Sequence, residues 1–166
     1  ADQVKRVTLE LGGKSANVIF ADADLAKAAA SAPYGVFDNA GQDCCARSRI
    51  LVQRSVLDEF LALLEPAVLG VRVEDPSLDT SEMGPLISRG HHASVSSYVT
   101  DATNVVIRGS VPDGPGFWYP PTVVLASSHD EPLMQEETFG PIVAVLPFDD
   151  EADAIRLAND TPYGLS

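Results

Sequence analysis

The sequence predicts an α/β fold in which a largely parallel sheet is flanked by helices. Two observations predict it. Short apolar, β-branched runs, typical of strands buried on both faces, alternate along the chain with segments whose apolar residues recur at helical spacing. Strands that alternate with helices pair in parallel, because each helix returns the chain across the sheet. The 166 residues are within the usual size of one domain.

The first half of the chain contains three predicted strands, over residues 6–11, 16–20 and 49–53. Three helices are predicted between or after them, over residues 25–32, 34–40 and 56–69. A Gly12-Gly13 turn separates the first two strands, and Asp22 or Asp24 can cap the first helix. Pro33 is expected to break or kink that helix, and Pro66 leaves the end of the third helix open.

The second half of the chain continues the alternation. Strands are predicted over residues 105–107, 122–125 and 142–146, and helices over residues 87–100 and 151–158. Polar or turn-rich loops are predicted over residues 75–85 and 110–116. The chain shows neither an internal repeat nor a low-complexity segment.

The charge and the apolar pattern exclude several classes of protein. A formal net charge of −13 argues against nucleic-acid binding, because phosphates need a basic surface. The longest apolar runs are too short to span a bilayer, so no membrane association is expected. No secretory signal pattern is present, and two adjacent cysteines make no disulfide framework. These features favour the reducing cytoplasm.

Both cysteines, Cys44 and Cys45, lie side by side in the stretch FDNAGQDCCARSR. In α/β folds functional sites lie in loops beyond the carboxyl ends of strands, and this stretch joins a predicted helix to the strand at 49–53. A thiol becomes nucleophilic when its pKa is lowered, for example by a nearby cation. Arg47 and Arg49 would lower it and Asp43 would raise it, so local charge alone leaves the reactivity of Cys44 open.

A reactive thiol also needs a partner. The three histidines, His91, His92 and His129, carry no local signature of a cysteine hydrolase, and the first two are expected on a solvated helix face. No histidine and carboxylate cluster has the spacing of a zinc site, so no metal is expected. A carboxylate is the other option. Glu10, at the end of a predicted strand before Gly12-Gly13, could activate a water molecule, although a lone strand-end glutamate is ordinarily solvated.

Four stretches in this order resemble the aldehyde dehydrogenase superfamily. They are the glutamate signature LELGGKS at residues 9–15, the cysteine signature F-x-x-x-G-Q-x-C at 37–44, the motif ETFGP at 137–141, and the segment NDTPYGLS at 159–166. The resemblance implies the three-layer catalytic-domain fold of that family. It also implies that residues 1–166 are the cysteine-bearing catalytic domain, truncated at both ends, with the dinucleotide-binding domain absent.

The resemblance implies a mechanism. Cys44 would attack an aldehyde, and hydride transfer to NAD or NADP would leave a thioester that a water activated by Glu10 hydrolyses to the acid. The Cys44 backbone amide and an asparagine outside this chain would hold the oxyanion. Glu137 would bind the nicotinamide ribose and Phe139 would pack near the nicotinamide. The cofactor would be held mainly by the absent domain, so the isolated chain is expected to be inactive.

Asp43 and Cys45 flank the nucleophile at places that often touch substrate in this family. An aspartate at position 43 resembles aminoaldehyde-oxidising members such as the aminobutyraldehyde dehydrogenases, because a carboxylate can hold a substrate ammonium.

The parent is expected to be a homo-oligomer, and the isolated chain is expected to self-associate through exposed apolar surfaces. Two alternatives remain, a non-catalytic scaffold of the same fold and a coenzyme A-acylating enzyme. Glu10 disfavours the latter, whose members lack that glutamate.

Overall fold

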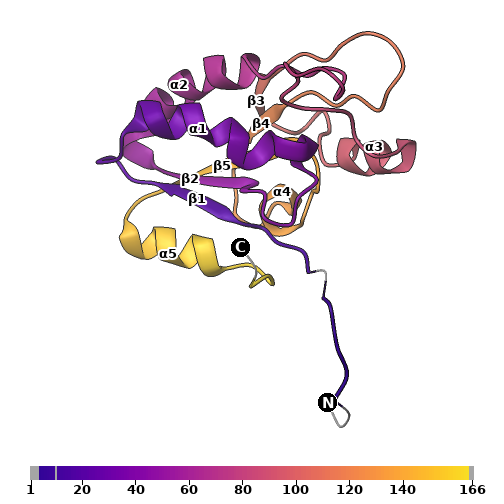
Figure 1. Cartoon of the computed structure of the whole chain (residues 1–166). Coiled ribbons are helices and arrows are strands. Elements are labelled where there is room, and N and C mark those ends of the chain that lie inside the picture. Colours follow the sequence, from indigo (N-terminus) through magenta and orange to yellow (C-terminus); the bar gives the residue numbers. More distant parts are fainter. Residues whose placement is uncertain (1–3, 10, 165–166) are drawn as a thin grey trace.

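A five-stranded sheet forms the centre of the molecule (Figure 1). The computed structural model describes residues 4–9 and 11–164. The strands are β1 (Ala16–Ile19), β2 (Arg49–Gln53), β3 (Val105–Arg108), β4 (Thr122–Leu125) and β5 (Ile142–Phe148). Their order is β1-β2-β5-β4-β3, in which every pairing is parallel except that of β3 with β4. The predicted, largely parallel sheet is confirmed.

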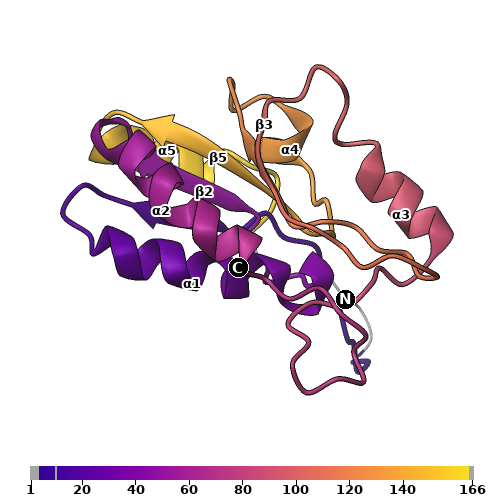
Figure 2. The same cartoon turned by 90° about the horizontal axis from the view of Figure 1, so that it is seen from above.

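Helices cover both faces of this sheet. They are α1 (Leu25–Phe37), η1 (Asp38–Gly41), η2 (Arg54–Val56), α2 (Leu57–Leu69), α3 (Arg89–Ser96), α4 (Pro132–Gln135) and α5 (Glu151–Asn159). Helices α1 and α2 pack together on one face and α5 lies on the other, as the two views in Figures 1 and 2 show. The result is a helix–sheet–helix sandwich of three layers, as predicted.

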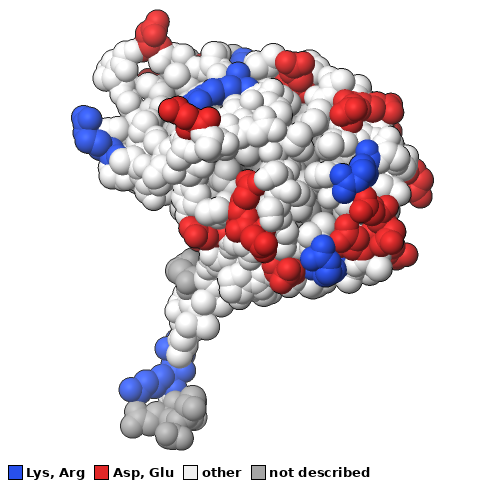
Figure 3. Space-filling view, turned by 180° about the vertical axis from the view of Figure 1, so that it is seen from behind, with Lys and Arg blue, Asp and Glu red and all other residues white. Residues whose placement is uncertain are grey.

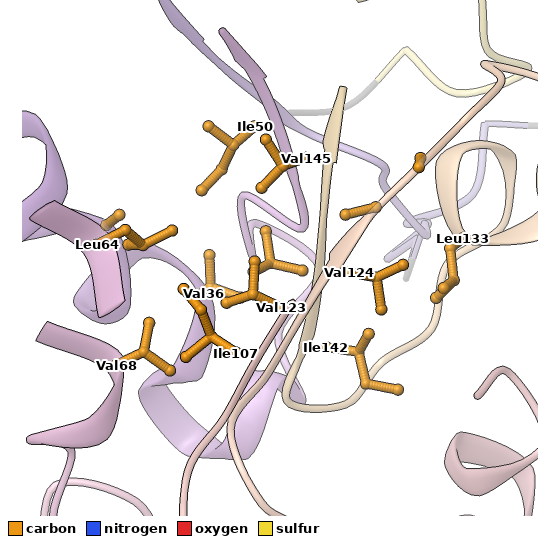
Figure 4. Packing of buried hydrophobic residues seen from close by; sticks show 14 of the residues in the cluster. Val36, Ile50, Leu64, Val68, Ile107, Val123, Val124, Leu133, Ile142 and Val145 are labelled. Atoms are coloured by element: carbon orange, nitrogen blue, oxygen red, sulfur yellow. The ribbon is translucent and has the colours of Figure 1, made fainter. Parts of the chain in front are cut away.

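The core fills the space between the sheet and its helices (Figure 4). Val123 and Val124 are adjacent in β4 and point to opposite faces, as the two-residue period of a strand requires. Val123 faces Leu64 and Val68 of α2, whereas Val124 faces Leu133 of α4. Strands buried on both faces account for the continuous apolar runs in the sequence.

The starts of three helices are fixed by side-chain caps. Asp24, not Asp22, caps α1, and its carboxylate accepts the Lys27 N–H at 3.0 Å. Ser88 caps α3 in the same way through the His91 N–H, and Asp150 caps α5. Each cap satisfies one of the donors that the first helical turn leaves free, which fixes where the helix begins.

Both helix prolines are tolerated, so the first helix does not end at Pro33 and the separate helix predicted over residues 34–40 is wrong. Helix α1 continues through Pro33 to Phe37, and α2 continues through Pro66 to Leu69. An interior proline costs about 3 kcal/mol. The buried residues Val36 and Phe37 follow Pro33, and burying each side chain contributes about 1.5–3 kcal/mol, which offsets the penalty.

Two further predictions need correction. Residues 6–9 and 11 form no strand; residues 4–9 extend away from the body with Val4, Val7 and Leu9 exposed (Figure 1), and Glu10 lies outside the described residues. Without a neighbouring strand the apolar alternation there has no partner to pair with. Helix α3 is also shorter than the predicted 87–100, and the single-turn α4 was not predicted.

Acidic side chains spread over the face in Figure 3, with basic ones between them, in keeping with the net charge of −13. In the described part of the chain, no helix has the length and apolar character needed to cross a bilayer.

Candidate active site

Three of the four sequence signatures lead into neighbouring strands at the same end of the sheet. The glutamate signature runs into β1, the cysteine signature precedes β2, and residues 137–141 run into β5. These three strands are parallel neighbours, and Ala16, Arg49 and Ala144 lie side by side at this edge. The signatures therefore gather at the amino ends of the strands. Functional sites in α/β folds ordinarily lie beyond the carboxyl ends of the strands. This group of signatures lies at the amino ends, because each signature is in the segment that leads into its strand.

Glu137 joins two of these segments. One carboxylate oxygen accepts the Gly13 N–H at 3.0 Å, and the Glu137 N–H donates to the Tyr163 hydroxyl at 3.2 Å. A Cβ on Gly12 would lie 2.6 Å from the other carboxylate oxygen, a distance that real Cβ contacts do not reach. The absence of a side chain at Gly12 therefore lets the carboxylate lie close to the backbone, whereas the predicted Gly12-Gly13 turn is not present in the described residues.

Lys14 makes a second link between the same segments. Its side chain is 2 % exposed, and its amine donates to the Thr138 hydroxyl at 3.2 Å. Burial and, to a smaller extent, the nearby Arg49 charge lower the pKa of Lys14 from 10.5 to about 7, against the opposing effect of Glu137 and Glu136. The buried amine is therefore about half neutral near neutral pH, and it can donate to Thr138 in either form.

Arg49 is buried and turned away from the cysteines. Its guanidinium donates to the carbonyl oxygens of Lys14, Leu157 and Ala158, at 2.8–3.0 Å. Burial lowers its pKa. The expectation that Arg49 supplies positive charge to the thiols is therefore wrong. Its role in this structure is to tie the entry of β1 to the end of α5.

The cysteine loop leaves α1 through a left-handed turn. Asn39, Ala40 and Gly41 all have positive φ, and a Cβ on Gly41 would overlap the Gly140 carbonyl oxygen. The Gln42 side chain accepts the Ile87 N–H at 2.9 Å and donates to the Asn39 carbonyl. This turn presses the cysteine loop against the 137–141 segment, and only glycine fits at the contact.

Cys44 is half-buried and Cys45 is exposed, with 3.8 Å between the two sulfur atoms. Asp43 accepts the Cys45 N–H at 3.0 Å. The Cys45 thiol, followed by the Asp43 carboxylate, raises the pKa of Cys44. The described groups around Cys44 therefore favour its thiol over its thiolate.

Asp43 and Cys45 also line a surface hollow of about 300 Å³ beside α1, together with Tyr34, Asp38 and Arg47. Cys44 does not line this hollow. The two residues predicted to touch substrate therefore share an open surface, next to the predicted nucleophile.

Phe139 is the middle residue of the third signature and has a strained backbone conformation. Its φ is +52°, which costs a non-glycine residue about 1–3 kcal/mol, and 38 % of its surface is exposed. Its carbonyl oxygen lies 2.7 Å from His91 Nε2, and the two rings meet edge to face. Strain of this kind is typical of functional sites.

The histidines do not serve the thiols in the described part of the chain. His91 and His92 are half-buried, so the predicted solvated face is confirmed only in part; their Nε2 atoms pair with the Phe139 and Trp118 carbonyls. His129 is buried and pairs with the Asp160 carbonyl at 2.7 Å. Nothing local in the sequence marks the contact of His91 with Phe139, because it joins residues 48 apart.

The sequence as a whole matches one known family. The match to "Aldehyde dehydrogenase family" covers residues 1–166. The chain belongs to the aldehyde dehydrogenase family. The resemblance inferred from the four signatures is thereby confirmed.

Individual aldehyde dehydrogenases are similar along almost the entire chain. An aldehyde dehydrogenase of Aspergillus niger is 42% identical over 167 residues, covering 98% of this chain and 34% of the relative. A betaine aldehyde dehydrogenase of Bacillus subtilis (strain 168) is 41% identical over 171 residues, covering 98% and 35%. A crystal structure of an indole-3-acetaldehyde dehydrogenase complexed with NAD+ superimposes with a TM-score of 0.90 at 40% identity, covering 96% of this chain and 34% of that one. The chain thus spans about a third of the length of these aldehyde dehydrogenases.

Proposed function

We propose that this chain supplies the catalytic cysteine of an enzyme that oxidises an aldehyde to a carboxylic acid with NAD or NADP. The observation that carries the proposal is the meeting of three family signatures at the amino ends of β1, β2 and β5. A scaffold without activity would have no need to keep a strained Phe139 and a glycine-dependent carboxylate contact at that edge.

Cys44 is the proposed nucleophile. After loss of its proton, its sulfur adds to the carbonyl carbon, and the electrons of the C=O bond move to the oxygen. No acceptor among the described residues takes the Cys44 N–H, whereas the Cys45 N–H is bound to Asp43. The Cys44 N–H is therefore available to stabilise the oxyanion.

Glu137 and Phe139 are the proposed contacts to the cofactor. A carboxylate has about four acceptor positions, and Gly13 occupies one of those on Glu137, so the carboxylate can still accept sugar hydroxyls. Phe139 offers an exposed ring beside it. When bound, the nicotinamide cofactor would accept a hydride from the carbon attached to the Cys44 sulfur, so that the thiohemiacetal is oxidised to a thioester. Whether NAD or NADP is used depends on residues outside this chain, although the similar indole-3-acetaldehyde dehydrogenase was crystallised with NAD+.

Glu10 is the proposed base for the second half of the reaction. It would take a proton from the water that attacks the thioester, which releases the acid and restores the Cys44 thiol. Glu10 lies outside the described residues, so its role rests on its place in the LELGGKS signature. The same residue favours hydrolysis over transfer of the acyl group to coenzyme A.

Asp43 and Cys45 are the proposed substrate contacts, and an aminoaldehyde is the proposed substrate. Asp43 has one oxygen engaged by the Cys45 N–H, which leaves the rest of the carboxylate to meet an ammonium group. The similarity to a betaine aldehyde dehydrogenase, an enzyme named for a cationic aldehyde, supports this choice.

The length of the chain, compared with that of its relatives, supports a proposal about the domain that it represents. We take residues 1–166 to be a truncated catalytic domain of a longer parent, because the chain spans about a third of its relatives. The dinucleotide-binding domain would lie outside it, and the parent would be a cytoplasmic homo-oligomer. Exposed Val4, Val7 and Leu9 give the isolated chain apolar surface through which to self-associate.

A chimaera tests the proposed function. Residues 1–166 would replace the matching segment of the full-length Bacillus subtilis relative, and NADH formation would be followed with an aminoaldehyde. We expect activity in the chimaera and in its Cys45→Ser variant, and a loss of at least about a thousandfold in Cys44→Ser. If the Cys44→Ser protein still binds NAD and keeps its activity, the assignment fails. Steady NADH formation by the chain alone would contradict the proposed truncation.

A further inference from the structure

The two thiols and the carboxylate beside them form a compact group of ligand atoms. The sulfur atoms of Cys44 and Cys45 are 3.8 Å apart, and one ligand atom each from Asp43, Cys44 and Cys45 lies within 4.8 Å of the others. Neither cysteine is in a disulfide. The sequence predicted no metal site because no histidine and carboxylate cluster has the spacing of a zinc site, and this group contains no histidine.

The spacing of the sulfur atoms matches that of a tetrahedral ion. Zinc–thiolate bonds are about 2.3 Å long, and two such bonds at the tetrahedral angle place the sulfur atoms about 3.8 Å apart. The observed distance between the sulfur atoms of Cys44 and Cys45 is 3.8 Å. An ion could therefore bind both thiolates without moving them relative to each other.

The loop also holds the third ligand in place and leaves the ion a path of entry. Asp43 is fixed by two hydrogen bonds, from the Cys45 N–H to its carboxylate and from the Ala46 N–H to its carbonyl. Asp43 and Cys45 are exposed and line the surface hollow beside α1, so an ion reaches them directly from solvent. Arg47 lines the same hollow, and its charge would weaken the attraction for a cation.

We propose that Asp43, Cys44 and Cys45 form a binding site for a soft, thiophilic divalent cation such as Cd²⁺ or Zn²⁺. Two sulfur ligands select such ions over Mg²⁺ and Ca²⁺, which prefer oxygen. Three protein ligands leave the fourth tetrahedral position to water, as in open zinc sites. Binding releases the thiol protons and ties up the Cys44 sulfur, so the bound ion blocks alkylation of that residue. The site stands on this geometry alone and does not depend on the proposed dehydrogenase activity.

Titration of the chain with Cd²⁺ tests the proposal, because sulfur-to-metal charge-transfer absorbance can arise only from Cys44 and Cys45, the only cysteines present. We expect one ion per chain, and protection of Cys44 from iodoacetamide that a chelator reverses. Cys45→Ser should weaken binding by at least about tenfold and reduce the absorbance, and Asp43→Asn should weaken binding to a smaller extent. Asp38→Asn is the matched control, since it removes a carboxylate from the same hollow but not from the ligand group.

Two results would overturn the site. The first is equal Cd²⁺ affinity and absorbance in the unmodified chain and in both Cys45→Ser and Cys45→Ala, with far-ultraviolet circular dichroism showing that all are folded. The second is one ion per two chains with a mass in sedimentation that doubles on addition of Cd²⁺, which would assign the ligands to two molecules. Mg²⁺ at the same concentration should give neither protection nor absorbance.

Discussion

The Glu137 carboxylate accepts the backbone N–H of Gly13 at 3.0 Å, and the two residues are 124 positions apart in the chain. With the Lys14–Thr138 hydrogen bond one residue further along each segment, this contact holds the glutamate signature against the motif that precedes β5. Two of the family's sequence signatures are thus parts of one structural unit at the amino edge of the sheet.

Replacement of Glu137 by alanine should destabilise the chain. Gly13 is buried, and loss of its acceptor leaves an unsatisfied donor, which costs about 1–3 kcal/mol. Glu137→Gln is the matched control, because its amide oxygen can still accept the Gly13 N–H. Urea unfolding should therefore give a lower midpoint for Glu137→Ala than for Glu137→Gln. Equal midpoints would show that the contact contributes nothing to stability.

Lys14 should make stability depend on pH. Its pKa is about 7 in the folded chain and near 10.5 when unfolded, so between these values the unfolded state binds one more proton. Stability therefore rises with pH across this window. Each pKa unit corresponds to about 1.4 kcal/mol, so the gain is on the order of a few kcal/mol.

The comparison with Lys14→Met isolates that effect. As pH rises from 7 to 10, the unfolding free energy of the unmodified chain should increase relative to that of Lys14→Met. The exposed Lys27 provides the control variant Lys27→Met. A difference that stays constant with pH for Lys14→Met, as for Lys27→Met, would exclude a buried lysine with a lowered pKa.

Removing either neighbour should make Cys44 more reactive. The Cys45 thiol and then the Asp43 carboxylate raise the pKa of Cys44, so Cys45→Ser and Asp43→Asn should each lower it. The pH dependence of iodoacetamide alkylation, with peptide mapping to separate the two cysteines, measures this pKa. A midpoint for Cys44 that is unchanged or raised in both variants would show that neither neighbour raises its pKa.

The contact between Gly41 and Gly140 should be intolerant of a side chain. Gly41→Ala places a Cβ against the Gly140 carbonyl and adds the cost of φ +68°, a total of several kcal/mol by the usual scale of overpacking and backbone strain. Gly114→Ala adds positive-φ strain at +109° but meets no atom within 4 Å. Thermal unfolding should show the larger loss for Gly41→Ala. A loss no greater than that of Gly114→Ala would show that the loop yields.

Local pattern was enough to predict most of the fold. The strands at residues 49–53 and 122–125 were predicted with the bounds that the structure has, because their apolar β-branched runs are buried on both faces. The parallel sheet followed from the alternation of strands and helices. Pro33 was misjudged because its local penalty is outweighed by the burial of Val36 and Phe37, a tertiary effect absent from any short window.

The site was only partly predictable. Signature motifs predicted Cys44, Glu137 and Phe139 as site residues, and all three lie in segments at the amino ends of the strands; their roles stay predictions, and Glu10 lies outside the described residues. Arg49 was misread because nearness in sequence to Cys44 does not fix where its long side chain points. The metal-ligand geometry depends on side-chain directions within one loop, which residue spacing does not encode.

The location of the acyl group during the reaction tests the proposed roles of Cys44 and Glu10 directly. A Glu10→Gln chimaera, supplied with aldehyde and NAD, should form NADH once and then stop, because the thioester is no longer hydrolysed. Peptide mass spectrometry should then find the acyl mass on Cys44 and not on Cys45. An acyl group on Cys45, or continued turnover with no acyl group on either cysteine, would contradict the proposed roles of Cys44 and Glu10.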